Sequence, residues 1–200
     1  MILSRQNQKL KDIRRWKRSK GGRAVLEGPH LVAEALAAGL LLETVLVTPE
    51  LAASPAGTAL LASLAARQPQ TVPLEVAAGL LAEIADADSP QGILATAFLP
   101  RQGAVALPVA DGGLYLFLDR LQDPGNLGAL ARAAEAAGAA GLALAPQTVH
   151  PNHPRALRAS AGSLLRLPIA VDVEPEDLDR RLSAAGPLWL ALLPQGGTDL

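Results

Sequence analysis

Short apolar runs alternate with longer amphipathic stretches along the whole chain. In the first half, aliphatic runs predict strands at residues 23–27, 43–48, 71–75 and 92–98. Between these runs, Ala- and Leu-rich stretches predict helices at residues 29–38, 56–66 and 76–85. Strands that alternate with helices over short connections are typical of an α/β domain, which we expect to end near residue 100.

A Pro- and Gly-containing stretch at about residues 100–113 precedes a second alternation. It begins at LYLFLD, 114–119, whose continuous apolar character predicts a strand buried on both faces. Further strands are expected at 141–145, 167–173 and 187–193, and helices at 127–138, 153–159 and 175–185. The pattern therefore predicts an α/β protein with two domains, 1–103 and 104–200.

The composition excludes several classes of protein. With 50% hydrophobic and 18% charged residues in 200, the chain is not a disordered tail. Five aromatic residues are too few for a stacking platform that binds bases. No apolar run approaches the roughly 20 residues of a membrane span, and the start lacks the apolar segment of a signal peptide. The absence of cysteine excludes disulfides, thiolate nucleophiles and Cys-ligated zinc, and favours a reducing, cytoplasmic setting.

The formal net charge of −1 conceals an asymmetry. Residues 1–23 carry nine basic side chains and one acid, Asp12, whereas the other 177 residues carry nine basic and eighteen acidic side chains. A segregated basic block is typical of a polyanion-binding surface, since each neutralised phosphate releases a counterion. A solvated helix face is an equally weighted alternative. Leu10, Ile13 and Trp16 form a thin apolar stripe that we expect to pack on the chain's own domain rather than on a membrane.

Chemistry is expected where the first strand of the second domain turns into its helix. Ligands of open α/β sheets gather at the carboxyl ends of strands, and N–H groups at a helix start favour an anion. In the turn Asp123-Pro124-Gly125-Asn126, Asn126 is the expected N-cap. Gly125 and Gly128 would allow the close approach of another backbone or a ligand. The pattern is neither a dinucleotide fingerprint nor a P-loop, and by itself indicates a tight turn.

Arg132 lies in the first two turns of the expected helix, from where its guanidinium would reach a phosphate or ribose oxygen near the loop. The alternative is a surface ion pair with Glu135, worth only about 0.2–0.5 kcal/mol. On the residues alone, the ion pair is favoured.

Three further arginines, Arg155, Arg158 and Arg166, bracket a Ser-Ala-Gly turn at 160–162. Phosphate contacts and ordinary solvated charges are equally weighted for them. His150 and His153 have a spacing that would suit two metal ligands, but no third ligand is evident and the flanking prolines predict a loop. No metal site is therefore expected.

Four segments, in consistent order, resemble the SpoU (TrmH) family of RNA ribose 2′-O-methyltransferases. DRLQDPGNLGALARAAEAAG at 119–138 is similar to the first signature motif of that family, with an Asp-Pro-x-Asn-x-Gly core and an Arg six residues after the Asn. RALRASAGSLLRLPI at 155–169 is similar to the segment in which a Ser-Ala-Gly turn precedes a Leu-Pro strand. DADSPQGILATAF at 86–98 and RAVLEGPHLVAEAL at 23–36 resemble the end and the start of the family's substrate-binding domain.

The resemblance implies a ribosomal-protein-like α/β/α domain that binds structured RNA, followed by an α/β-knot (SPOUT-type) methyltransferase domain. It also implies S-adenosylmethionine as the cofactor, ribosomal or transfer RNA as the substrate, and a homodimer. By the same resemblance, Asn126 takes the place of the motif Asn that organises the catalytic loop, and Arg132 that of the Arg at the ribose 2′-hydroxyl. Because the pKa of an arginine lies above about 12, we expect Arg132 to orient the hydroxyl rather than to act as a base.

The expected contacts extend to both ends of the chain. By resemblance, the strand end Leu192, Leu193 and Pro194 would touch the cofactor rim. The expected RNA contacts come from the basic block and from the Ser-Ala-Gly turn, and are Arg14, Arg15, Lys17, Arg18, Arg155, Arg158 and Ser160.

The sequence departs from the family in one respect. The Gly-Glu-Gly-like turn and the Ser-Leu-Asn stretch of its second and third motifs have no counterpart before Leu200. We therefore expect a methyltransferase domain that is truncated before the knot is complete and that binds S-adenosylmethionine weakly or not at all. The alternative function is a non-catalytic RNA-binding protein or an inactive fragment of such an enzyme.

Overall fold

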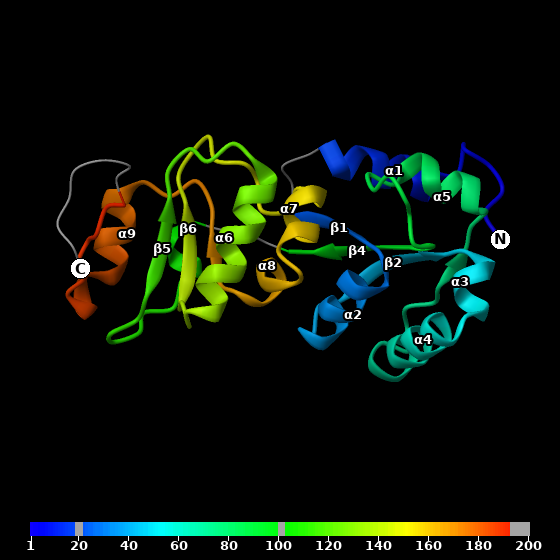
Figure 1. Cartoon of the computed structure of the whole chain (residues 1–200), viewed down its shortest axis with the longest axis horizontal. Helices are drawn as coiled ribbons and strands as arrows, with labels where there is room; N and C mark the ends of the chain where they lie inside the picture. The colour runs from blue at the N-terminus through cyan, green and yellow to red at the C-terminus, as the bar shows by residue number, and fades with distance from the viewer. Residues whose placement is uncertain (19–21, 100–102, 193–200) are drawn as a thin grey trace.

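The computed structural model describes residues 1–18, 22–99 and 103–192, which form two β-sheets side by side along the long axis of the molecule (Figure 1). The elements of the first half are α1 (Gln8–Arg18), β1 (Arg23–Glu27), α2 (Pro29–Ala37), β2 (Leu42–Val47), α3 (Pro49–Ala53), α4 (Pro55–Arg67), β3 (Leu74–Glu75), α5 (Ala78–Ile84) and β4 (Ile93–Phe98). Those of the second half are η1 (Ala104–Ala106), β5 (Tyr115–Leu118), α6 (Pro124–Ala136), β6 (Gly141–Leu144), α7 (Pro154–Ala159), α8 (Ser163–Arg166), β7 (Ile169–Ala170), α9 (Pro175–Leu182) and η2 (Ser183–Ala185).

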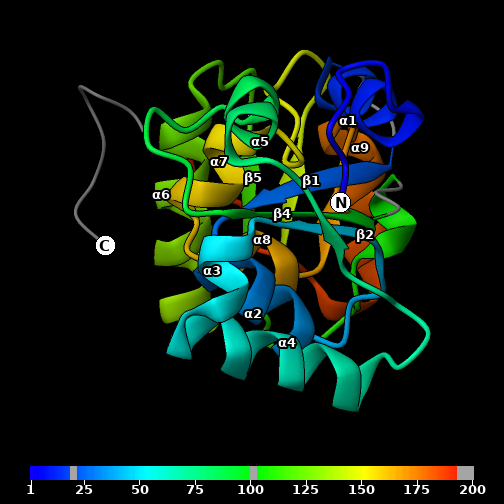
Figure 2. The same cartoon turned by 90° about the vertical axis from the view of Figure 1, so that its right-hand side faces the viewer.

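The first sheet has the strand order β1-β4-β2-β3 and helices on both faces. Central β4 runs antiparallel to β1 and β2, and β3 runs parallel to β2. Because successive side chains of a strand point to opposite faces, Leu94 packs with α1 and α5 whereas Ala95 packs with α2 and α4. Figure 2 shows the two groups of helices on opposite sides of the strands. The expected α/β/α layering is confirmed.

Helix α1 packs on this sheet through its apolar stripe. Leu10 and Ile13 are fully buried, and Trp16 packs against the same cluster. The guanidinium of Arg23 lies 4.8 Å from the centroid of the Trp16 ring. The expectation that the stripe packs the helix on its own domain is confirmed, and the basic residues between the stripe positions lie at or near the surface.

The second sheet is parallel, in the order β5-β6-β7. Leu142 and Leu144 of central β6 face α6, α7 and α8, whereas Ala143 faces α9. The expected burial of the first strand on both faces is wrong for most of β5, since only Leu118 is buried in it. The physical reason is that, in the part of the chain that the structure describes, β5 lies at the edge of its sheet and pairs only with β6.

Two other expected strands differ in the structure. The run at 167–173 forms a strand only at Ile169–Ala170, and shortly after it Asp172 adopts a φ of 54°, outside the β region. Residues 187–192 of the run at 187–193 form no strand, because no described strand edge pairs with them. Trp189 holds this segment, with its ring 6.1 Å from that of Phe117 and its Nε1–H donating to Asp179 at 2.8 Å.

The two sheets share one apolar cluster. Helix α7 lies along β1, the edge strand of the first sheet, and the cluster continues from Leu26 and Leu31 to Leu157 and Leu164 (Figure 1). Helices α6, α7 and α8 therefore lie between the sheets and belong to the packing of both. Among the described residues, no helix has the length and apolar character needed to cross a membrane.

Candidate functional site

The turn from β5 into α6 is built around Asp123. Helix α6 begins at Pro124, a favourable first position because proline lacks the N–H that would have no partner there. The backbone N–H of Asn126 donates to Oδ1 of Asp123 at 2.8 Å. The prediction that Asn126 is the N-cap is wrong, because the helix starts earlier and Asp123 caps it. Asn126 instead presents an exposed side chain in the first turn.

All three loops at the carboxyl ends of the parallel strands contain a non-glycine residue with positive φ. These residues are Arg120 after β5, Gln147 after β6 and Asp172 after β7, with φ values of 49°, 65° and 54°. The Gln122 amide joins the first two loops by donating to the carbonyl oxygens of Arg120 at 2.8 Å and Gln147 at 2.7 Å. Such sparsely populated conformations persist where surrounding contacts hold them, and they concentrate at functional loops.

Helices α6 and α7 cross in close contact at Gly128. A Cβ at this position would lie 2.5 Å from Cβ of Ala159 and 2.7 Å from the carbonyl oxygen of Ala156. The expected close approach at Gly128 is thus that of another backbone. Ser160, which caps α7, is fully buried and its hydroxyl donates to the carbonyl of Leu157 at 2.8 Å. The prediction that Ser160 contacts RNA is therefore corrected: its hydroxyl serves the end of the helix.

Arg132 projects into an open groove between α6 and the turn from α7 to α8. The groove has a volume of about 550 Å³, and its lining includes Ala129, Ala136 and Ser163. Within the described residues, the Arg132 guanidinium is exposed and has no ion pair with an acid. The alternative of an ion pair with Glu135 is wrong, because Arg166 occupies that carboxylate. Arg132 thus remains a free cation at the edge of a groove.

Glu135 is bound by Arg166 in a two-point contact. Nε and Nη2 of Arg166 donate to the two carboxylate oxygens at 2.6 and 2.8 Å, the geometry of a bidentate pair. These hydrogen bonds lower the pKa of Glu135 to about 2 against the opposing effect of burial, with a smaller contribution from Ser163. The same contact raises the pKa of Arg166. The acid of this groove is therefore ionised and fully engaged at neutral pH.

The predicted RNA contacts on α1 differ from one another. Arg15 is largely exposed and pairs with Asp12 at 3.0 Å, and Arg14 is partly exposed with Glu83 at 3.5 Å. The side chain of Arg18 lies outside what the structure describes. These contacts stay predictions.

Lys17 is the exception on α1. Its side chain is only 9% exposed, and its ammonium lies 2.8 Å from Glu27 and 2.9 Å from Asp86. It also donates to the carbonyl of Ile84. The prediction that Lys17 contacts RNA is corrected, because its charge is used inside the folded chain.

Arg155 and Arg158 lie one turn apart on α7 and have different neighbours. The Arg155 side chain is 62% exposed, with Nη2 3.7 Å from the capping carboxylate of Asp123. The Arg158 side chain is 31% exposed, and its Nη1 lies 3.1 Å from Glu27 of the first half. Arg155 therefore borders the β5–α6 turn, while Arg158 reaches the first sheet.

The predicted cofactor contacts lie at the far end of the described chain. Leu192 is 87% exposed, and Leu193 and Pro194 lie outside the described residues. The cavity at the carboxyl ends of β6 and β7, lined by His150 and Asp172 among others, measures about 140 Å³. A pocket for a ligand of the size of S-adenosylmethionine measures about 300–1,000 Å³. This cavity alone is therefore smaller than a pocket for the whole cofactor.

The two histidines of the loop before α7 accept hydrogen bonds from the backbone. Nδ1 of His153 accepts from the N–H of Arg155, and Nδ1 of His150 accepts from the N–H of Asn152, both at 3.1 Å. Among the described residues, no three His, Asp or Glu side chains are grouped as metal ligands. In each case the ring accepts from a backbone N–H two residues later in the chain.

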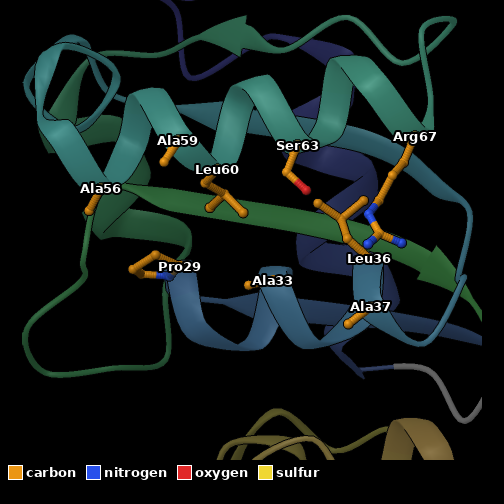
Figure 3. A pocket seen from close by; sticks show the side chains of 9 residues that line it. All are labelled: Pro29, Ala33, Leu36, Ala37, Ala56, Ala59, Leu60, Ser63 and Arg67. Atoms are coloured by element: carbon orange, nitrogen blue, oxygen red, sulfur yellow. The ribbon is translucent and has the colours of Figure 1, made fainter.

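A separate hollow of about 360 Å³ lies between α2 and α4 (Figure 3). Leu36 and Leu60 form its floor, and Ser63 and Arg67 are the polar side chains of its lining. This lining lacks the convergent polar groups of a ligand site, and we assign no role to it.

Glu27 and Glu34 are the polar residues that sequence reasoning missed. Glu27 is buried at the end of β1, directly after three apolar residues, and a buried acid requires a partner. The signal was its position in RAVLE, directly before the Gly-Pro that opens α2. Its partners come from distant segments, which no local pattern identifies.

Comparisons with known families match the two halves separately. A model described as the SpoU rRNA methylase family matches residues 113–200, and one described as the MRM3-like substrate-binding domain matches residues 5–95. An uncharacterized tRNA/rRNA methyltransferase of Synechocystis is 37% identical over 203 residues, covering 100% of this chain and 72% of that protein. The 23S rRNA (guanosine(2553)-2′-O)-methyltransferase RlmP of Bacillus subtilis is 29% identical over 197 residues, covering 92% of this chain and 70% of that protein.

Solved structures give the same result in three dimensions. The crystal structure of an rRNA methyltransferase from Sinorhizobium meliloti matches with a TM-score of 0.77 and 32% identity, covering 92% of this chain and 69% of that chain. The AdoMet-bound rRNA methyltransferase from the same organism matches with a TM-score of 0.76 and 31% identity, covering 92% and 68%. At this coverage, each superposition includes both sheets.

Proposed function

The chain belongs to the SpoU rRNA methylase family, and we propose that it transfers the methyl group of S-adenosylmethionine to a ribose 2′-hydroxyl of ribosomal or transfer RNA. Its fold is that of the family's solved members, as the resemblance implied. The named activity of RlmP and the AdoMet-bound structure from Sinorhizobium meliloti support the reaction and the cofactor.

The observation that carries the proposal is that Arg132, at its groove, pairs with no acid in the described ranges. Among the described residues its guanidinium has no carboxylate partner, whereas Arg166 in the same groove pairs with two carboxylates. A free cation beside small side chains is suited to an RNA phosphate or a ribose oxygen. Methyl transfer requires an in-line approach of that oxygen, so we assign Arg132 the orientation of the ribose. Asn126 presents its exposed amide from the first turn of the same helix.

We assign RNA docking to the basic side chains that are exposed. On α1 these are Arg14 and Arg15, and on α7 they are Arg155, beside the β5–α6 turn, and the partly exposed Arg158. Their positions support a surface that reaches from the first half to the turn. Lys17 and Ser160 are left out because their polar groups are buried and occupied.

We assign RNA binding to residues 1–103 and the methyltransferase domain to residues 104–200, which are the bounds predicted from the sequence. The two family models, which match residues 5–95 and 113–200, support this division. The resemblance supports a homodimer that acts in the cytoplasm.

The reaction is tested with S-adenosylmethionine labelled in its methyl group. The full-length protein is incubated with labelled cofactor and with deproteinised ribosomal or transfer RNA, and the RNA is then hydrolysed in alkali. A 2′-O-methyl group blocks cleavage at the adjacent phosphodiester, so we expect label in alkali-stable dinucleotides. Label on a base, or RNA binding without any transfer, would contradict the proposal, and the second result would favour a non-catalytic RNA-binding protein.

A further inference from the structure

Two carboxylates of the first half bind two arginines of the second half. Glu27, the last residue of β1, pairs with Arg158 of α7 at 3.1 Å. Glu34 of α2 pairs with Arg166, the last residue of α8. Between the two acids in the chain lies buried Leu31, which belongs to the apolar cluster shared by the sheets. The apolar contact is therefore accompanied by two ion pairs in which the acid is always on the substrate-binding half.

Glu27 joins three separate segments through one carboxylate. Its side chain is 5% exposed and accepts from the backbone N–H groups of Asp86 at 2.9 Å and Ala87 at 3.1 Å. It also receives the ammonium of Lys17 at 2.8 Å and the guanidinium of Arg158. A buried carboxylate that loses its donors is strongly unfavourable, so this arrangement holds α1, the loop after α5 and α7 in one geometry.

The second ion pair leads directly to the groove of Arg132. Arg166 binds Glu34 with Nη1 and Glu135 of α6 with Nε and Nη2. Gly162, with a φ of 94°, allows this approach, because a Cβ there would lie 2.8 Å from Oε2 of Glu34. One guanidinium thus connects α2 of the substrate-binding half to the helix that carries Arg132.

The two halves share one apolar cluster, and apolar contact is non-directional, so directional contacts are needed to fix their relative angle. We propose that Glu27 and Glu34 are positioning residues, which fix the angle and distance between the RNA-docking surface and Arg132 and so determine which ribose of a docked RNA reaches it. The proposal rests on the proposed function for its RNA part. Its ligand is a folded RNA whose target ribose lies at a fixed distance from the docked segment.

Selection of the methylated ribose and the free energy of unfolding are separate properties of the protein. A partly exposed ion pair such as Glu34 with Arg166 contributes little to the free energy of unfolding. A charged pair between two packed halves acts mainly on their relative orientation, because it is satisfied in one arrangement only. The matched control is Glu43, whose pair with Arg23 at 2.9 Å lies entirely within the first half.

The relative orientation of the two halves is measured without an activity assay. The chain has no cysteine, so spin labels can be placed singly on each half, at Ala65→Cys of α4 and Glu176→Cys of α9, both exposed. We expect one narrow distance distribution in the labelled parent and in its Glu43→Gln derivative. In the Glu27→Gln/Glu34→Gln derivative we expect a distribution at least twice as wide. An unchanged width in that derivative would overturn the proposal.

Glu34→Gln alone serves as the second variant, since Glu34 is partly exposed and Arg166 keeps Glu135 as a partner. If the double variant does not fold, as judged by circular dichroism, the single variant is decisive. A measurable broadening supports the proposal, and a width equal to that of the parent contradicts it.

The part of the proposal that concerns the choice of ribose is tested by mapping the methylated nucleotide. In full-length protein carrying Glu34→Gln, we expect kcat to fall about tenfold, label to appear on riboses next to the parent's target, and KM for RNA to stay within about threefold. Methylation of the same ribose with unchanged kcat would overturn the proposal. If the parent transfers no methyl group, the proposed function fails, and the distance measurement still decides whether the two acids position the halves.

Discussion

The two sheets differ in how completely they are covered. In the first, helices pack on both faces, α7 covers the edge strand β1, and five of the six residues of β4 are buried. In the second, the edge strand β5 is mostly half-buried. Leu188 and Leu192, which lie after η2, are more than 80% exposed. The first sheet is thus a packing unit that is covered on both faces. The second is less completely covered among the described residues.

The largest expected effect comes from a cavity in the first sheet. Leu94 of β4 is fully buried, so Leu94→Ala should lower the free energy of unfolding by about 2–5 kcal/mol. Leu116→Ala in half-buried β5 should cost about half as much, since less apolar surface returns to water. Urea denaturation of both variants measures the difference. Equal losses would contradict the view that the two sheets differ in packing.

The next effect concerns the contact of α6 with α7. Gly128→Ala should destabilise by about 1–3 kcal/mol, because the new Cβ overlaps the backbone of α7. The control is Gly79→Ala in α5, where the added Cβ would contact no other part of the chain within 4 Å, and it should stabilise by about 0.5–1 kcal/mol. Thermal unfolding measures whether each variant is more or less stable than the parent. A stabilising Gly128→Ala would refute the close contact.

A smaller effect depends on pH. The pKa of Glu135 is about 2 in the folded chain against 4.5 as its ordinary value, so its contact with Arg166 stabilises fully above pH 4.5. That stabilisation is lost as pH falls towards 2. After allowance for solvent screening of this partly exposed pair, it amounts to about 1–2 kcal/mol.

Glu135→Gln should therefore flatten the fall of stability between pH 4.5 and 2, measured by urea denaturation at each pH. Asp177→Asn, which removes an exposed pair with Arg180 on α9, is the control and should keep the parent's profile. If Glu135→Gln keeps the parent's dependence of stability on pH, the Glu135 carboxylate does not have the stabilising contact with Arg166.

The same contrast explains how much the sequence predicted. Strands at 23–27 and 92–98 agree with β1 and β4 because their apolar character reflects burial between two helix layers. The run at 187–193 has the same character, but a strand also requires a neighbouring edge, and pairing is not a local property. The capping error at Asn126 arose because Asp123 is an equally good cap and the proline after it sets the start of the helix.

For the site, the charges were identified but not their partners. The sequence indicated Lys17, Arg158 and Arg132 as cations, and their pairing depends on acids 10 to 131 residues away or on the absence of one. Lys17 and Arg158 meet at Glu27, while Arg132 meets no acid among the described residues. Only the folded chain separates Arg132, which meets no acid among the described residues, from the cations that pair with acids of distant segments.

The central claim is that Arg132 orients the ribose for methyl transfer. The most direct measurement compares the Arg132→Ala variant of the full-length protein with Arg180→Ala, which removes an exposed arginine of α9, in methyl transfer to RNA and in RNA binding. We expect Arg132→Ala to lower kcat by about 100-fold or more with RNA affinity within about threefold, and Arg180→Ala to match the parent. Unchanged turnover in Arg132→Ala would contradict the assigned role.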